Sequence, residues 1–211
     1  MNTPTVLFDL GNVLVRLDLP RGLSHLRRLA GRRAPQTLES AELHFGEAST
    51  ACNRGDLSPE AFIAELARQL GAPASPTTHS SLVEAWCDIF EPWPEMEALA
   101  DEVLQAGHAA YLASNTDPLH FAFLELQMPV LRRLTGLHLS YEARVMKPDP
   151  AFFTGLLARF GLRAADCVYL DDRAEHVEAA RSVGIRAAIH EGEVAKARAF
   201  LCEAGVRIRR G

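Results

Sequence analysis

Residues 5–15 read TVLFDLGNVLV: an apolar run stops at one carboxylate, turns through Gly11 and Asn12, and becomes apolar again. A short apolar run near an N-terminus, followed by helical patterns, is typical of a buried strand in a parallel sheet. Open α/β sheets bind ligands at the carboxyl ends of their strands. The stretch therefore predicts that Asp9 lies at such an edge, although a turn or capping role is the simpler explanation for one isolated Asp.

Later strand patterns also end in polar side chains. The apolar runs 109–113 and 167–170 are followed by Ser-Asn-Thr at 114–116 and by two adjacent acids at 171–172. Ser-Asn after a strand is a common turn, and Lys147, before a proline, is compatible with a surface loop. Two adjacent acids after an apolar run are costly unless they are paired or bind metal. The coincidence of all these groups at strand ends predicts one shared site.

These residues carry a resemblance to a known family. The stretch 8–14 (FDLGNVL) resembles the first motif of the haloacid dehalogenase superfamily of aspartate-nucleophile hydrolases. Residues 114–115, 147–148 and 171–172 match the order and spacing of its second, third and fourth motifs. The Asp-Leu-Gly-Asn form of the first motif is similar to a branch that includes sugar-phosphate phosphatases of the glucose-1-phosphatase type. The resemblance implies an α/β fold with a Rossmann-like three-layer parallel sheet core and an inserted α-helical cap.

The pattern along the chain divides in the same way. Residues 1–15 are the expected first strand and nucleophile loop, 16–91 the cap, and 92–211 the remainder of the core. In the cap, Ser58 and Pro59 predict a helix start and Gly71 its end, and a further helix is expected over 82–90. The expected core elements are strands over 109–113, 136–140, 167–170 and 185–189, and helices over 94–107, 118–126, 130–134, 150–161 and 193–204.

Composition excludes several classes of protein. The 211 residues are 48% hydrophobic and 23% charged with a net charge of −5, so a globular core is expected and a nucleic-acid or anionic-membrane partner is not. No run reaches the ~18–20 apolar residues of a membrane span, and no signal peptide is visible. Four widely spaced cysteines form no CxxC pair, which favours a reducing cytoplasm. A monomer or a homodimer acting on a small molecule is expected.

The resemblance implies roles for the acidic residues. Asp9 would be the nucleophile and form an aspartyl-phosphate that water hydrolyses. Mg²⁺ would be held by the carboxylates of Asp9 and Asp171 and by the backbone carbonyl of Gly11. Asp172 would orient a metal-bound water.

The resemblance also implies how the phosphate is held. Lys147 would neutralise the phosphate and keep Asp9 ionised. The hydroxyl of Ser114 and the amides of Asn115 and Thr116 would donate hydrogen bonds to its oxygens. The expected substrate is a small phosphate ester, with a sugar phosphate favoured.

Gly11 departs from the pattern, because phosphatases of this superfamily usually have a second Asp there, which protonates the leaving oxygen. General acid–base catalysis typically contributes about 10²–10⁴-fold. Three explanations remain open: the enzyme is slow, its leaving group needs little protonation (an anomeric sugar oxygen or an acyl phosphate), or another acid replaces the missing one. Candidates for that acid are Asp18, His25 and His44, each also compatible with an ordinary surface or capping role.

Two other functions compete with a phosphatase. An L-2-haloacid dehalogenase has the same fold, also lacks the second Asp and needs no metal, but the acidic pair would then have no use. A non-catalytic binding or regulatory protein would not need Asp9, Lys147 and Asp171 together. Among the histidines, His176 lies one turn after Asp171 and could contact the residues around the metal, although a position on the helix surface is expected. His120 is a candidate for substrate contact.

Overall fold

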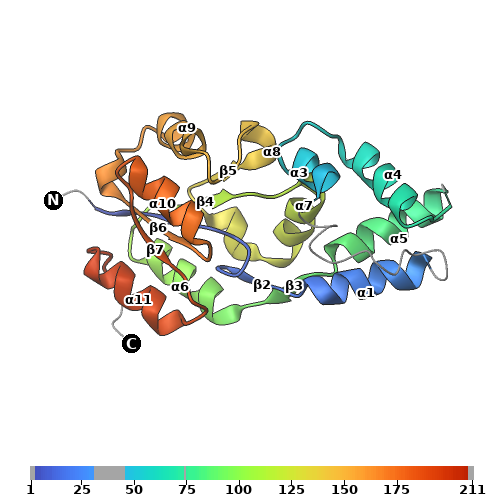
Figure 1. Ribbon diagram of the computed structural model, residues 1–211. Helices are drawn as coiled ribbons and strands as arrows, with labels where there is room; N and C mark the ends of the chain where they lie inside the picture. The colour runs from blue at the N-terminus through green and yellow to red at the C-terminus, as the bar shows by residue number, and fades with distance from the viewer. Residues whose placement is uncertain (1–2, 31–45, 74, 209–211) are drawn as a thin grey trace.

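The computed structural model describes residues 3–30, 46–73 and 75–208. These residues form a five-stranded parallel sheet in the order β5-β4-β1-β6-β7 (Figure 1). The strands are β1 (Thr5–Phe8), β4 (Ala110–Ser114), β5 (Gly136–Leu139), β6 (Cys167–Asp171) and β7 (Arg186–Ile189). The sheet and the helices on both of its faces confirm the predicted α/β Rossmann-like core. The strand that carries Asp9 is the central one.

Helices cover the two faces of this sheet. One face lies against α6 (Pro94–Gln105), α7 (Pro118–Gln127), the 3-10 helix Pro129–Arg133 and α11 (Val194–Glu203). The other lies against α9 (Pro150–Phe160) and α10 (Ala174–Ser182). Two short helical turns, α8 (Ser140–Ala143) and the 3-10 helix Ala164–Asp166, complete the core. The observed elements lie within a few residues of the predicted ones.

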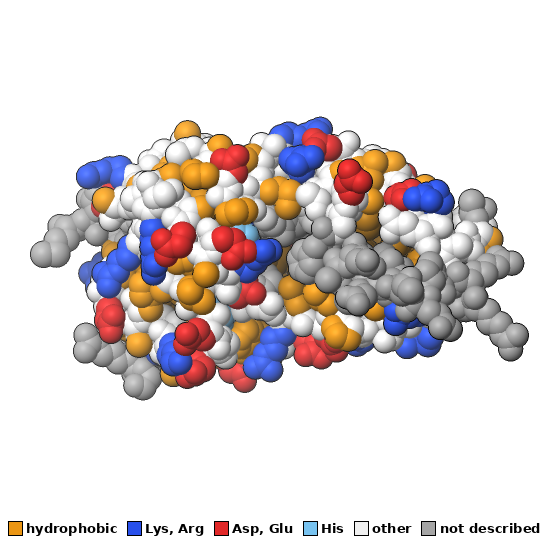
Figure 2. All heavy atoms as spheres, viewed as in Figure 1, with side chains coloured by type: hydrophobic (Ala, Val, Ile, Leu, Met, Phe, Trp, Pro, Cys, Tyr) orange, Lys and Arg blue, Asp and Glu red, His pale blue; other side chains and the backbone are white. Residues whose placement is uncertain are grey.

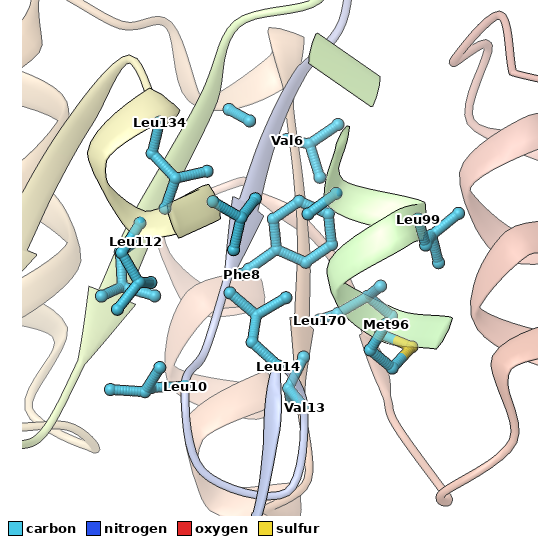
Figure 3. Close-up of a cluster of buried hydrophobic side chains, with 14 of the residues drawn as sticks. Val6, Phe8, Leu10, Val13, Leu14, Met96, Leu99, Leu112, Leu134 and Leu170 are labelled. Carbon is cyan, nitrogen blue, oxygen red and sulfur yellow. The ribbon is translucent and has the colours of Figure 1, made fainter. Parts of the chain in front are cut away.

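The alternation of side chains along β1 explains how a wholly apolar strand fits between two helical layers. Val6 and Phe8 are fully buried on the face that packs against α6, where they are directed toward Met96 and Leu99 (Figure 3). Leu7 belongs to the buried cluster on the opposite face. Successive side chains of a strand point to opposite faces, so both faces of a central strand must be apolar.

The segment predicted as the cap contains helices with a separate buried cluster. They are α1 (Leu19–Ala30), α3 (Glu47–Asn53), α4 (Pro59–Gln69) and α5 (Pro76–Cys87), and they lie together at the right of Figure 1. The hydroxyl of Ser58 accepts a hydrogen bond from the amide of Ala61, which confirms the predicted N-cap. We retain 1–15, 16–91 and 92–211 as the proposed division into core and cap.

A two-stranded antiparallel ribbon joins these two parts, and the sequence did not predict it. It consists of β2 (Val15–Leu17) and β3 (Phe90–Pro92), with Leu17 opposite Phe90. The helix expected over 82–90 is therefore wrong at its end, since α5 stops at Cys87. Three-residue strands are too short to show a period of two, and their pairing is a contact between distant parts of the chain.

Charged side chains of both signs are mixed on one face of the molecule. On the face drawn in Figure 2, acidic and basic side chains lie next to one another over the core, and the described residues there form no broad area of one charge. Within the described ranges, no helix combines the length and apolar character needed to cross a membrane.

Candidate active site

Lys147 lies at the centre of a buried cluster at the carboxyl ends of the strands. It comes from the loop between α8 and α9, and its side chain is fully buried. Its Nζ lies 2.8 Å from Oδ1 of Asp9 and 2.7 Å from Oδ2 of Asp171. It also donates to the backbone carbonyl of Ala113 at 2.9 Å. The structure thus brings together the ends of β1, β4 and β6 with the predicted lysine.

Tyr169 completes this cluster, and the sequence analysis did not single it out. Its hydroxyl accepts a hydrogen bond from Lys147 Nζ at 2.8 Å and donates one to the carboxylate of Asp171. Burial raises the pKa of Tyr169, so the hydroxyl keeps the proton that it donates. In the sequence, Tyr169 is one more apolar-looking residue of a buried strand. Only its position two residues before Asp171, on the same side of β6, would have suggested the contact.

The charges in this cluster act on one another through a medium from which water is excluded. Burial raises the pKa of Asp9 to about 7, although the ammonium of Lys147 lowers it. Burial also works against the ionised form of Asp171, but Lys147 and His176 outweigh it and hold the pKa of that carboxyl below its usual range. Burial would lower the pKa of Lys147, yet the two carboxylates raise it above its usual value. Lys147 is therefore charged, and Asp9 is the group whose protonation is finely balanced.

The prediction of a surface position for His176 is wrong. The residue is 4% exposed, and its Nδ1 lies 2.9 Å from Oδ1 of Asp171. It occupies the first turn of α10, which begins directly after the loop that follows β6. The tight connection turns the helix back over the strand end, so a residue five positions after Asp171 faces it. Asp9, Asp171 and His176 also place ligand atoms close enough together to share a metal ion.

The nucleophile loop is held by Asn12. This residue has a φ of +54°, in the left-handed region that Asn tolerates better than most residues. Its side-chain Nδ2 donates to Oδ2 of Asp172 at 3.0 Å, and its side-chain Oδ1 accepts from the backbone amide of Leu17 at 3.2 Å. The loop after β1 is thereby tied to the acidic pair after β6.

The absence of a side chain at Gly11 lets the side chain of Leu17 lie close to the backbone there. A Cβ at this position would lie 2.9 Å from Cδ1 of Leu17. Leu17 thus stands next to the position from which a second Asp would project. The side chain nearest that position is apolar, and a carboxylate placed there would have to displace the end of Leu17.

The residues that follow β4 have two kinds of contact. The side chain of Asn115 binds the backbone of Lys147 twice, donating to its carbonyl at 2.8 Å and accepting from its amide at 2.9 Å. The amide of Thr116 donates to Oγ of Ser140 at 3.0 Å. Ser114 is buried at the end of β4. Asn115 thus positions Lys147, and the amide of Thr116 would have to leave Ser140 to donate to a phosphate.

Two of the candidates for a replacement acid, Asp18 and His25, contact residues outside the pocket beside the nucleophile loop. Oδ1 of Asp18 accepts a hydrogen bond from the amide of Arg21 at 3.0 Å. Nδ1 of His25 lies 3.0 Å from Oδ2 of Asp88. His44 falls outside the described residues. In the described part of the chain, neither Asp18 nor His25 lines the pocket beside the nucleophile loop.

That pocket lies between the nucleophile loop and the cap and has a volume of about 110 Å³. Its lining residues are Leu10, Gly11, Leu17, Leu19, Asn53, Trp86, Ile89, Phe90, Ser114, Asn115, Thr116 and His120. His120, which was a candidate for substrate contact, is one of these lining residues. Its Nδ1 lies 2.9 Å from Oδ2 of Asp117, and its Nε2 lies 3.0 Å from the carbonyl of Trp86.

The donor set suits a hard divalent cation. Carboxylates and a backbone carbonyl are the oxygen ligands that Mg²⁺ takes, together with water and phosphate. Asp171 is completely buried and contacts Lys147, Tyr169, His176 and the amide of Arg173. Asp172 is half-buried and accepts a hydrogen bond from Asn12. Both acids are therefore candidates for a cation ligand. They differ in how many contacts their carboxylate oxygens already make within the protein.

Comparison with known proteins agrees with this geometry. The family model described as haloacid dehalogenase-like hydrolase matches residues 3–184. The phosphatase MT3486 of Mycobacterium tuberculosis is 27% identical over 194 residues, which cover 89% of this chain and 87% of that protein.

Two solved structures share the fold. A HAD family enzyme of Bacteroides thetaiotaomicron, in complex with magnesium and inorganic phosphate, has a TM-score of 0.79 at 22% identity, over 90% of this chain and 96% of that one. An L-2-haloacid dehalogenase of Xanthobacter autotrophicus, with chloropropionic acid covalently bound, has a TM-score of 0.64 at 16% identity, over 97% and 84%. At these identities the likeness concerns the fold alone.

Proposed function

As the chain belongs to the haloacid dehalogenase-like hydrolases, we propose that it is a Mg²⁺-dependent phosphatase that hydrolyses a small phosphate ester through an aspartyl-phosphate. The observation that supports this most is the contact of 2.8 Å between Lys147 Nζ and Oδ1 of Asp9, deep in a site with two further carboxylates. A buried nucleophile with a fixed cation beside it suits attack on a charged phosphate. The similarity to a protein named as a phosphatase points the same way.

The chain's own residues perform two displacements. Because Oδ1 of Asp9 pairs with Lys147, Oδ2 is the oxygen that attacks phosphorus, and the bond to the leaving oxygen breaks with its electron pair. Water then attacks the same phosphorus and releases phosphate and the Asp9 carboxylate. The ammonium of Lys147 offsets the negative charge that develops on the phosphoryl oxygens. The Ser114 hydroxyl and the amides of Asn115 and Thr116 are the proposed phosphate donors, Thr116 after release from Ser140.

Bound Mg²⁺ would supply charge that offsets the repulsion between Asp9 and the phosphate. We propose Asp9, the Gly11 carbonyl and Asp171 as its ligands, with Asp172 orienting a bound water. The contacts of the two acids also support the reverse arrangement, in which Asp172 is the ligand and Asp171 holds Lys147. Titration of Mg²⁺, followed by intrinsic tryptophan fluorescence, distinguishes the two arrangements. Asp171→Asn should weaken Mg²⁺ binding more if Asp171 is the direct ligand, and Asp172→Asn should weaken it more if Asp172 is.

The leaving group follows from Gly11. With Leu17 beside it and with Asp18 and His25 outside the pocket, a substrate whose leaving oxygen needs little protonation is favoured. An anomeric sugar phosphate, which the first motif suggested, meets that requirement of the leaving oxygen, and so do acyl, aryl and enol phosphates. Among the described polar side chains of the cap segment, Asn53 lines the pocket, while Arg16 stacks on Trp93 at 4.4 Å. A cytoplasmic setting and a monomeric or dimeric state stay proposals from the sequence.

The test is release of phosphate from acetyl phosphate, glucose 1-phosphate and p-nitrophenyl phosphate, with Mg²⁺, with EDTA and in Asp9→Asn. We expect Mg²⁺-dependent release that Asp9→Asn abolishes, and trapping of [³²P]phosphate on the wild-type chain only. If chloride is freed from 2-chloropropionate in EDTA and phosphate is never released, the protein is a dehalogenase. A folded protein without either activity would be a binding homologue.

A further inference from the structure

We infer that the group esterified to the phosphate is compact and largely apolar, of the size of one aromatic ring and carried on an oxygen that leaves as a stabilised anion, as in an aryl or enol phosphate. The inference rests on the proposed phosphatase function and names its substrate class. It concerns the pocket between the nucleophile loop and the cap.

The pocket is continuous with the place where the phosphate must sit. At one end it is lined by Gly11, which follows the nucleophile by two residues, and by residues 114–116 at the end of β4. A phosphate bound against these groups points its ester oxygen toward the rest of the pocket. What lines the remainder therefore faces the leaving group.

That remainder is apolar. Five hydrophobic side chains line it beyond the phosphate end: Leu17, Leu19, Trp86, Ile89 and Phe90. Leu17 and Phe90 are opposite one another in the β2–β3 ribbon, so the connection between core and cap itself forms a wall. Leu17 also lies against Gly11, which brings this wall to the position nearest the ester oxygen.

The polar atoms on this side of the pocket are mostly engaged already. Both ring nitrogens of His120 lie within 3.0 Å of an acceptor, Asp117 or the Trp86 carbonyl. Nε1 of Trp86 donates to Asp117 at 3.1 Å. Among the described residues, Asn53 is the remaining polar side chain of the lining on the cap side. A sugar with several hydroxyls would lose hydrogen bonds to water here and regain few, at a cost for each unpaired group.

Size and chemistry restrict the group further. The pocket holds about 110 Å³, less than the apolar cavity of about 150 Å³ that accommodates benzene, so it encloses no more than one ring. The bond between Oδ2 of Asp9 and phosphorus forms as the bond from phosphorus to the aryl oxygen breaks. The aryl oxygen keeps the electron pair and takes its proton from solvent after leaving. A phenolate or enolate tolerates that sequence far better than an alkoxide, and it needs no acid at position 11.

The first measurement uses wild-type protein with Mg²⁺ and two unreactive probes, phenylphosphonate and methylphosphonate, in calorimetric titrations. Burial of the ring should tighten binding of phenylphosphonate by about tenfold or more. Equal affinities overturn the inference. In parallel, phenyl phosphate should have a kcat/KM at least about tenfold above that of glucose 1-phosphate. Preference for glucose 1-phosphate, or for farnesyl phosphate over phenyl phosphate, also overturns it.

The second measurement uses Leu17→Asn, with Leu126→Asn as the control because Leu126 is 77% exposed on α7. The ratio of kcat/KM for phenyl phosphate to that for acetyl phosphate should fall at least about fivefold in Leu17→Asn and stay unchanged in Leu126→Asn. An unchanged ratio in a folded Leu17→Asn protein contradicts the inference. Acetyl phosphate distinguishes failure of the proposed function from failure of this inference. If acetyl phosphate is not hydrolysed, the proposed function fails. If it is hydrolysed but the ring gives no preference, only the inference fails.

Discussion

Lys147→Met tests the electrostatic structure of the site most directly. The substitution keeps most of the side chain's volume and removes its charge. Lys147 is one of two lysines in the chain, and its side chain is fully buried between Asp9 and Asp171. Without it, two buried carboxylates face one another with no fixed cation between them.

The size of the effect follows from burial. Breaking a buried ion pair by removing one partner typically costs about 3–5 kcal/mol, because the remaining charge is left uncompensated. For a chain of this size, about 1 kcal/mol lowers Tm by roughly 2–4 °C, so a fall of about 6–20 °C is expected in EDTA. The loss should shrink on acidification from pH 8 to pH 5. Asp9 takes up a proton more readily in the variant, so the folded state binds more protons there than the wild type does.

The assay is thermal unfolding followed by circular dichroism at several pH values in EDTA, with Lys196→Met as the matched control. Lys196 is the other lysine and pairs on the surface with Glu191 and Glu193. Surface ion pairs contribute little, so the control should keep the wild-type Tm. Equal Tm values for the two variants, or a deficit of Lys147→Met that does not depend on pH, would refute the assignment of Lys147 as the compensating charge.

Two further predictions concern the cluster around Lys147, and a third concerns the contact between Trp86 and Asp117. The pKa of Asp9 is about 7 in the folded state against the 3.8 usual for Asp, so between these pH values the folded protein holds a proton that the unfolded chain has released. The Tm of the wild type in EDTA should therefore fall from about pH 4 to pH 7, and Asp9→Asn should remove this part of the pH dependence. Parallel Tm profiles for the wild type and Asp9→Asn would contradict the prediction. Tyr169→Phe removes one hydrogen bond to Lys147 and one to Asp171 with little change of shape. Each bond to a charged group contributes about 1.5–3 kcal/mol, so the loss in urea unfolding should be at least that of one such bond, and kcat should fall more than KM rises. A change in KM alone would count against a positioning role. Trp86→Phe removes the hydrogen bond from Trp86 on α5 to the buried Asp117 at the start of α7. The free energy of unfolding should fall by about 1–3 kcal/mol, and amide hydrogen exchange in α5 should become faster. Unchanged exchange would show that this contact does not hold the cap to the core.

Much of the core could be predicted because its signals are local. Continuous apolar runs of three to five residues mark β1, β4 and β6, and helix starts such as Asp149-Pro150 show cap chemistry that acts within one turn. The β2–β3 ribbon was missed because its two strands are three residues each and are separated by more than 70 positions in the chain. Pairing at that distance leaves no periodic pattern.

The amino-acid sequence by itself predicted that Asp9, Ser114 and Asp171 lie at the ends of buried strands, and it shows that residue 11 has no carboxylate. Only the tertiary structure decided that Tyr169 and His176 contact Asp171, and that Leu17 stands beside Gly11. The physical reason is that a side chain's face follows from local backbone geometry, whereas its neighbour follows from how separate strands and helices pack. The same packing makes the wall of the pocket apolar.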